Sequence, residues 1–291
     1  KELVVKIRSP LRYPGGKSRA IKEIASYIIP NIPKNNKVCS PFFGGGSIEL
    51  YLADVKKKEV IGYDGFGPLV DFWKVLKKDP KGLARHVAKY KKLGKTERAK
   101  QSFPGLKKEF RKKSKQYSQV KRAAVFYVLN RTSYSGTTLS GGMAIDLEGK
   151  HWYKKINPRF NTDSIRRLEK FSVENFTVNK MDFRKSIPKN KDALIYADPP
   201  YFIEKKGLFY GDSGDKSFAR EDHEDLAKIL NGIKNKKWIL SYNNDEYIKN
   251  LYPKRRIKEV HWSYGMSDVK SRKKKHSSEI LILSDKIKIQ R

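Results

Sequence analysis

The stretch Leu194-Ile195-Tyr196-Ala197-Asp198-Pro199-Pro200-Tyr201 joins an apolar, aromatic run to a rigid polar corner. A short, nearly continuous apolar run predicts a strand buried on both faces, as in a parallel sheet. Two prolines fix two φ angles, remove two N–H donors and force Asp198 into an extended conformation. The sequence therefore predicts a buried strand whose carboxyl end presents a carboxylate on a rigid turn.

Other short apolar runs bounded by turn residues surround this one in the sequence. With it they make seven predicted strands, at residues 38–40, 60–63, 176–178, 194–197, 238–242, 258–262 and 280–283. Between them lie helical stripes, one on Ile21, Ile24, Ala25 and Ile28 and another within residues 223–233. Alternating strands and helices predict an α/β fold with a doubly wound, mainly parallel seven-stranded sheet.

A basic segment interrupts this alternation and predicts a second domain. Residues 74–122 hold 19 Lys and Arg against three acidic residues, nearly half of the chain's net charge of +34. Apolar residues recur there at helical spacing, for example Leu83, Val87, Phe103, Leu106 and Phe110. We predict a discontinuous domain of residues 1–72 and 172–291, with a mostly helical insert at 73–171. The one-sided charge and interleaved aromatics suit contacts with phosphates and bases, whereas a solvated helical face is the alternative.

Composition excludes several classes of protein. With 65 Lys and Arg against 31 Asp and Glu, the chain needs an anionic partner, and a phosphate backbone is the commonest. The single Cys39 excludes an intramolecular disulfide and a multi-cysteine zinc site, and the five His residues lack ligand spacing, so no metal is expected. The sequence has no apolar run long enough for a membrane helix or a signal peptide, and we expect a cytoplasmic protein that contacts no membrane.

A glycine turn, Pro41-Phe42-Phe43-Gly44-Gly45-Gly46-Ser47, follows the first predicted strand and opens a helix. Such a turn lets the backbone approach an anionic ligand at a helix N-terminus. Glu49 occupies the third glycine position of the dinucleotide fingerprint, which argues against a nicotinamide cofactor. Asp64 lies about 20 residues on, where an acid accepts hydrogen bonds from ribose hydroxyls. These features predict an adenosine-containing ligand with a carboxylate end, and S-adenosylmethionine fits that description.

The tetrad Asp198-Pro199-Pro200-Tyr201 suits methylation of an exocyclic aromatic amine, whose lone pair is delocalised into its ring. If the Asp198 carboxylate and the Pro199 carbonyl each accept an N–H, the nitrogen can direct its lone pair at a methyl group. Tyr201 offers a face on which a base can stack. A base in a duplex would first have to flip out of the helix.

These motifs, in this order around a basic insert, resemble the Dam-type enzymes, the alpha group (D12 class) of DNA N6-adenine methyltransferases. The resemblance implies a methyltransferase sheet with an inserted target-recognition domain, and S-adenosylmethionine-dependent transfer to N6 of a flipped-out adenine in a specific DNA sequence. It implies double-stranded DNA as partner and leaves open a cognate restriction endonuclease. We expect a monomer.

The resemblance also implies roles for single residues. The segment Leu11-Arg12-Tyr13-Pro14-Gly15-Gly16-Lys17 looks like the family's N-terminal run, and Met181-Asp182-Phe183 resembles the run that contacts the donor's adenine. Donor-binding residues are then Tyr13, Gly15, Gly16, Lys17, Pro41, Phe42, Gly44, Gly46, Ser47, Asp64, Asp182, Phe183 and Asp198, and catalytic residues are Asp198, Pro199, Pro200 and Tyr201. Residues 130–136 are similar to the start of the target-recognition loop. Predicted nucleic-acid contacts are Lys107, Lys108, Arg111, Lys112, Lys113, Arg122, Asn130, Arg131, Ser133, Tyr134, Lys273 and Lys274.

The chain departs from the family pattern at Pro14 and Tyr13, where Ala and Trp are usual, and after Gly136, where members that read GATC differ. No target sequence is therefore predicted. The tetrad recognises an exocyclic amine and not a particular ring, so cytosine N4 and RNA remain alternative targets. A further alternative is a non-catalytic nucleic-acid binder, which the presence of Asp198 and the intact glycine turn oppose. Another is a nicotinamide-dependent oxidoreductase, which Glu49 opposes.

Overall fold

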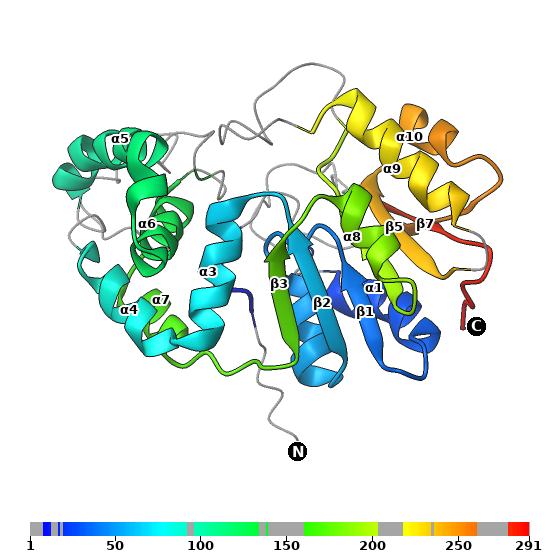
Figure 1. The fold of residues 1–291 in the computed structure, drawn as a ribbon, viewed down its shortest axis with the longest axis horizontal. Helices are drawn as coiled ribbons and strands as arrows, with labels where there is room; N and C mark the ends of the chain where they lie inside the picture. The colour runs from blue at the N-terminus through cyan, green and yellow to red at the C-terminus, as the bar shows by residue number, and fades with distance from the viewer. Residues whose placement is uncertain are drawn as a thin grey trace, which may run out of the picture.

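A seven-stranded sheet runs through the part of the chain that the computed structural model describes (Figure 1). The described residues are 8–12, 17, 20–91, 96–133, 138, 160–202, 218–233, 236–260 and 279–290, without the side chains of 96–102. The strands are β1 (Lys37–Ser40), β2 (Glu59–Asp64), β3 (Phe176–Lys180), β4 (Leu194–Ala197), β5 (Trp238–Asn243), β6 (Arg256–Val260) and β7 (Glu279–Leu283). Their order across the sheet is β3-β2-β1-β4-β5-β7-β6. The seven predicted strands are confirmed, with the one predicted at 258–262 found as β6; its residues 261 and 262 lie outside the described part of the chain.

Five of the strands, β3, β2, β1, β4 and β5, run parallel to one another, and β7 runs antiparallel to both β5 and β6. In the β5–β7 register, Asn243 at the end of β5 pairs with Glu279 at the start of β7. The first residue of β7 therefore lies at the edge of the sheet where the parallel strands end. The predicted doubly wound, mainly parallel sheet is confirmed.

Helices cover both faces of the sheet. Alternate residues of β4 separate into two apolar clusters: Leu194 and Tyr196 join the first, and Ile195 and Ala197 join the second. The first cluster includes residues of α1 (Ile21–Ile28), α2 (Ser47–Leu50) and α3 (Gly67–Lys78), and the second those of α8 (Phe183–Lys189), α9 (Arg220–Gly232) and α10 (Glu246–Leu251). Two short 3-10 turns, η1 (Ile29–Asn31) after α1 and η4 (Ser114–Gln116) farther along the chain, add to these elements. A π-helical turn, η2 (Tyr51–Val55), extends α2.

A helical region lies beside the β3 edge of the sheet and consists of α4 (Pro80–Ala88), α5 (Thr96–Lys113), α6 (Gln119–Thr132) and α7 (Thr162–Glu169) (Figure 1). Helix α6 is buried on nearly every side, because α3 and α4 both pack on it. The ring of Tyr127 on α6 stacks on Phe72 of α3, with ring centroids 5.6 Å apart. Phe103 and Phe110 of α5 are buried, as the helical spacing predicts.

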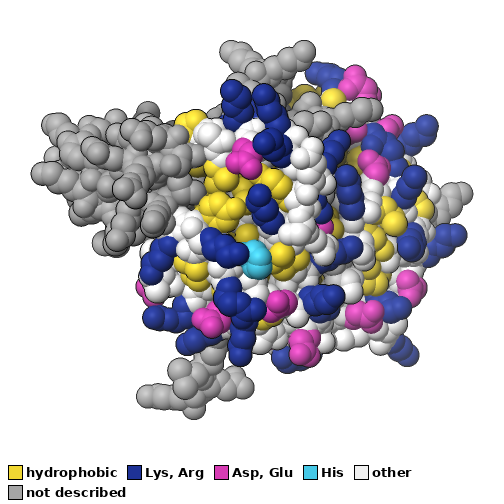
Figure 2. Space-filling model, turned by 60° about the vertical axis from the view of Figure 1, so that its left-hand side comes forward, with side chains coloured by type: hydrophobic (Ala, Val, Ile, Leu, Met, Phe, Trp, Pro, Cys, Tyr) yellow, Lys and Arg dark blue, Asp and Glu magenta, His cyan; other side chains and the backbone are white. Residues whose placement is uncertain are grey.

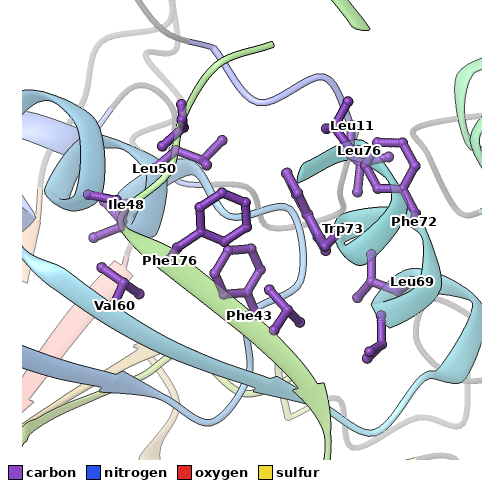
Figure 3. Close-up of a cluster of buried hydrophobic side chains, with 14 of the residues drawn as sticks. Leu11, Phe43, Ile48, Leu50, Val60, Leu69, Phe72, Trp73, Leu76 and Phe176 are labelled. Atoms are coloured by element: carbon purple, nitrogen blue, oxygen red, sulfur yellow. The ribbon is translucent and has the colours of Figure 1, made fainter. Parts of the chain in front are cut away.

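Helix α3 connects the helical region to the sheet. Its Trp73 packs edge-on against Phe43 and Phe176, with ring centroids 5.2 and 5.9 Å away (Figure 3). The core of the sheet therefore continues into the helical region without a break. The boundary between residues 72 and 73 falls inside α3, and the division into two domains stays a prediction.

Within the described residues, no helix is both long and apolar enough to cross a membrane. No group of three or more His, Cys, Asp or Glu side chains in that part of the chain is arranged to hold a metal ion. Cys39 is buried in β1, and burial raises the pKa of its thiol to about 12.

Candidate active site

The glycine turn between β1 and α2 has a conformation that favours glycine. Gly44 and Gly46 have φ angles of 49° and 68°, in the left-handed region where a side chain is strained. Phe43 fixes the turn, because its backbone N–H donates to the Tyr63 carbonyl at 2.8 Å and its ring stacks on Phe176 (Figure 3). The backbone from Gly44 to the start of α2 is thereby held at the carboxyl edge of the sheet.

Asp64, at the end of β2, is tied to the same turn. One carboxylate oxygen accepts from the Gly44 backbone N–H at 3.0 Å, and the other accepts from that of Phe66 at 3.0 Å. Burial raises the pKa of Asp64, while these two hydrogen bonds oppose the shift. Asp64 thus orients the glycine turn, and its predicted contact with a ribose stays a prediction.

The tetrad lies directly after β4, and its polar side chains meet two residues from distant parts of the chain. The Lys17 ammonium contacts the Asp198 Oδ1 atom and the Glu279 Oε1 atom, each at 2.9 Å. The Tyr201 hydroxyl donates to the other Glu279 oxygen and lies 3.3 Å from the Lys17 nitrogen. Lys17 and Glu279 are only 3% and 2% exposed, whereas the Asp198 side chain is 22% exposed. We call Lys17, Asp198 and Glu279 the charge cluster. Of these three charged side chains, Asp198 is the one that remains accessible to solvent.

The Asp198 carboxylate has one engaged oxygen and one open oxygen. Among the residues that the structure describes, none forms a hydrogen bond or an ion pair with its Oδ2 atom, while Lys17 occupies Oδ1. Burial raises the pKa of Asp198 to about 6, with Lys17 opposing the shift and Glu279 adding to it. The carboxyl group is therefore ionised at neutral pH and can accept a further hydrogen bond.

A second buried acid, Glu49 of α2, lies on the same face of the sheet. It is hydrogen-bonded to the Ser40 hydroxyl at 2.6 Å, and burial raises its pKa to about 8. Glu49 is therefore mostly neutral at pH 7. Lys17 remains charged, because the neighbouring carboxylates of Asp198 and Glu279 outweigh burial and raise its pKa well above the usual value. At neutral pH one ammonium and two carboxylates leave the charge cluster with a net charge of −1.

The predicted adenine-contacting residues lie on the other face. Asp182 caps the N-terminus of α8, where its side chain accepts from the Arg184 backbone N–H at 2.8 Å. The ring of Phe183 packs against Phe42 of the glycine turn, with centroids 5.4 Å apart, and Phe218 completes the group at 5.6 to 5.7 Å. The structure thus brings Phe42 and Phe183 together, as expected if both line one subsite.

A half-open pocket of about 620 Å³ lies beside the tetrad. Its lining includes Phe202, which follows Tyr201, and residues at the end of β5 and the start of α10. The rings of Phe202 and Tyr247 stack at 4.6 Å, and the Arg220 guanidinium lies 4.4 Å from the Tyr247 ring centre. Asn243 donates to the Phe202 carbonyl at 3.1 Å and so fixes the chain just after the tetrad.

The predicted nucleic-acid contacts fall into two groups. Lys108, Arg111, Lys112 and Lys113 are exposed along α5, and Lys107 is half-buried. On the side of the molecule that carries the helical region, Lys and Arg side chains visibly outnumber Asp and Glu (Figure 2).

The second group has partners inside the protein. Arg122 pairs with Asp71 at 2.5 Å, and Arg131 donates to the Pro10 carbonyl at 3.4 Å. Asn130 and Ser133 are fully buried, and Asn130 binds the backbone N–H and carbonyl of Arg12 at 2.9 and 2.6 Å. These four side chains hold the helical region and the N-terminal segment in place, and their contact with nucleic acid stays a prediction.

Several predicted site residues lie outside the described part of the chain. These are Tyr13, Gly15, Gly16, Tyr134, Lys273 and Lys274. Pro41 is buried at the end of β1, Ser47 begins α2, Pro199 is buried and Pro200 is half-buried.

Sequence reasoning missed Glu279 and Ser241. Ser241 of β5 donates to the Glu279 Oε1 atom at 2.6 Å, which completes the contacts of that carboxylate. The one local signal is a lone acid that opens the apolar run Ile280-Leu281-Ile282-Leu283.

The sheet order, the glycine turn after β1, the acid after β2 and the Asp-Pro-Pro-Tyr corner after β4 together define the class of amino-methyltransferases. Residues 13–266 match the family of D12 class N6 adenine-specific DNA methyltransferases, and the chain belongs to that family.

The chain is also similar to a second methyltransferase in sequence and, slightly, to one in structure. The chain is 25% identical over 272 residues to the Type II methyltransferase M.MjaIII of Methanocaldococcus jannaschii, covering 88% of this chain and 91% of that protein. It is also similar to the crystal structure of SMU.472, assigned as a methyltransferase and complexed with SAH. That likeness has 10% identity and a TM-score of 0.25, and it covers 60% of this chain and 46% of the other. It is too slight to carry an argument.

Proposed function

We propose that the protein transfers a methyl group from S-adenosylmethionine to N6 of a flipped-out adenine in double-stranded DNA. The family supports adenine as the target, and one observation supports the chemistry. The ionised Asp198 carboxylate keeps an open oxygen at the carboxyl edge of the sheet, on a corner that two prolines make rigid.

The residues of the site fit such a donor. The left-handed glycines hold the backbone open at the start of α2, Phe42 and Phe183 form an aromatic subsite, and the charge cluster carries a net negative charge. When bound, the donor supplies a methyl group on a positively charged sulfonium. We propose that Gly44 and Gly46 admit its amino-acid end, and that Phe42 and Phe183 contact its adenine.

In the proposed reaction, the Asp198 Oδ2 atom and the Pro199 carbonyl each accept one N–H of the target amine. The lone pair of N6 then lies out of the plane of the ring and points toward the methyl carbon. The new N–C bond forms as the C–S bond breaks, and N6 gives up one proton, for which Asp198 is the adjacent acceptor. The negative charge of Asp198 stabilises the positive charge that moves onto nitrogen.

The exposed basic face of α5 is the proposed DNA-binding surface, and residues 73–171 are proposed as the target-recognition domain. A phosphate backbone matches a helix that places Lys108, Arg111, Lys112 and Lys113 in solvent. Phe103 and Phe110, on the opposite side of α5, are buried in the core, so the basic side chains of this helix point into solvent.

Removal of four charges from α5 is expected to weaken DNA binding. In the variant Lys108→Ala/Arg111→Ala/Lys112→Ala/Lys113→Ala, the slope of log affinity against log salt should become shallower by up to about 3 to 4, since each lost phosphate contact removes about 0.9. Fluorescence anisotropy at several salt concentrations measures the slope. Alanine at Lys22, Lys56, Lys185 and Lys189, exposed lysines outside the helical region, is the matched control. Equal slopes for the two variants would show that α5 faces water.

Methyl incorporation tests the function itself. Purified protein, labelled S-adenosylmethionine and mixed-sequence duplex DNA are expected to yield N6-methyladenine after digestion to nucleosides. N4-methylcytosine, or label in RNA alone, would overturn the proposed target. Sequencing of the modified DNA would locate the recognised bases.

A further inference from the structure

Glu279 binds three polar side chains at the charge cluster, although it lies neither in the tetrad nor in the glycine turn. Its Oε1 atom binds the Lys17 ammonium at 2.9 Å and the Ser241 hydroxyl at 2.6 Å. Its Oε2 atom accepts the Tyr201 hydroxyl. Three partners from three separate segments thus converge on one buried carboxylate.

The antiparallel course of β7 puts Glu279 in this position. Glu279 opens β7 opposite Asn243, the last residue of β5, so its side chain reaches the edge of the sheet where β4 delivers the tetrad. It lies on the same face as Tyr196, because alternate β7 residues such as Leu281 belong to the first apolar cluster. The carboxylate is therefore fixed beneath the tetrad by the sheet itself.

The charges in this cluster explain what Glu279 can do. Lys17 alone, at 2.9 Å from Asp198, would neutralise the carboxylate that must attract the target amine. Glu279 lies at the same distance from Lys17 and balances its charge. Among the described residues, those that act electrostatically on Asp198 or on its cluster include Lys17, Glu279, Glu49, Tyr196, Tyr201 and Tyr242. Glu49 is mostly neutral at pH 7 and the tyrosines are neutral, so the second full negative charge belongs to Glu279.

We propose that Glu279 is a positioning residue for methyl transfer: it orients Lys17 and Tyr201 and offsets the charge of Lys17, so that Asp198 faces the target amine with its negative charge intact. This inference rests on the proposed function. Glu279 acts through Asp198 and Tyr201, not by touching the substrate.

The variant Glu279→Gln isolates the charge from the hydrogen bonds. The glutamine carbonyl can accept from Lys17 and Ser241, and its amide can donate to the Tyr201 oxygen, so each partner keeps a hydrogen bond, with the direction of the one to Tyr201 reversed. The single-turnover rate of methyl transfer is expected to fall by about 10- to 100-fold, which is less than the 10² to 10³ lost with a group that touches the reacting atoms, because Glu279 acts through its neighbours. Circular dichroism should show the wild-type fold.

The pH profile distinguishes this role from a structural one. Glu279 contributes to the raised pKa of Asp198, so its neutralisation should move the acid limb of the rate profile to lower pH. The control is Glu259→Gln, which removes an equal charge from an exposed residue of β6 that pairs with Ile280 of β7. This variant should keep the wild-type rate and pH profile. A wild-type rate in Glu279→Gln, or a lower rate with an unmoved acid limb, would overturn the proposal.

Two further measurements keep the test decisive. Glu279→Asp keeps the charge but withdraws it by one methylene, so the rate should fall while the acid limb stays near that of the wild type. A wild-type rate would overturn the positioning role, even if Glu279→Gln fails to fold. Titration of the Asp198 carboxyl by ¹³C NMR follows the same pKa change without turnover. If the wild-type protein is inactive but Glu279→Gln shifts the titration of Asp198, the proposed function is overturned, while the electrostatic effect of Glu279 on Asp198 still holds. An unshifted titration would overturn the inference.

Discussion

Asp198→Ala is expected to reduce methyl transfer by about 10³-fold or more, because loss of one preorganised electrostatic group alone costs 10² to 10³. In the proposed reaction Asp198 accepts a hydrogen bond from the amine, and it is also the accessible carboxylate of its cluster. Rapid-quench measurement of labelled methyl transfer gives the rate. DNA affinity should stay close to wild type, since α5 carries the proposed phosphate contacts.

Asp198→Asn provides the matched control for shape. It keeps a hydrogen-bond acceptor at the corner but removes the charge, so its rate should lie between those of wild type and Asp198→Ala. In the wild type, the rate should fall below pH 6, because protonation of Asp198, whose pKa is about 6, removes the acceptor charge. At pH 5 about a tenth of the Asp198 carboxyls remain ionised. Retained turnover with lost DNA affinity in Asp198→Ala would contradict the catalytic role.

Gly46→Ala is expected to weaken donor binding by about tenfold or more and to destabilise the fold by about 1 to 3 kcal/mol, the usual cost of overpacking. Gly46 has a φ of 68°, and an added Cβ would lie 2.7 Å from a ring carbon of Phe43 and 3.2 Å from one of Trp73. Both rings are buried, so the turn itself must move (Figure 3). Calorimetry with S-adenosylmethionine and thermal unfolding measure the two effects.

Gly65→Ala is the control for this substitution. A Cβ at Gly65 would meet no heavy atom within 4 Å, and the residue lies just beyond β2, next to Asp64. Its donor affinity and melting temperature should match those of the wild type. Equal effects of the two substitutions would show that the glycine turn has no special role in binding.

Local pattern was sufficient to predict the sheet and the tetrad. Strand β4 and its corner are adjacent in sequence, and the prolines after Asp198 fix the backbone without help from the rest of the fold. The same holds for the glycine turn, where the left-handed angles of Gly44 and Gly46 follow from residue type.

Long-range contacts could not be predicted in this way. Glu279 opens an antiparallel strand, so its place at the catalytic edge depends on the order of strands and not on its neighbours in sequence. Asn130 was predicted to contact nucleic acid from its place in a motif, yet its buried side chain binds Arg12, 118 residues away. A sequence pattern shows which side chains carry polar groups, but not which of them the folded chain uses itself.

The paired hydrogen bonds between Arg12 and Asn130 tie two parts of the chain that lead to different predicted ligand contacts. One end continues into residues 13–17, and the other lies at the close of α6, before residues 134–136. Neither of these two segments can move relative to the other without breaking both hydrogen bonds. The residue that precedes the predicted donor-binding run and the last turn before the predicted target-recognition loop are therefore anchored to each other by the same two bonds.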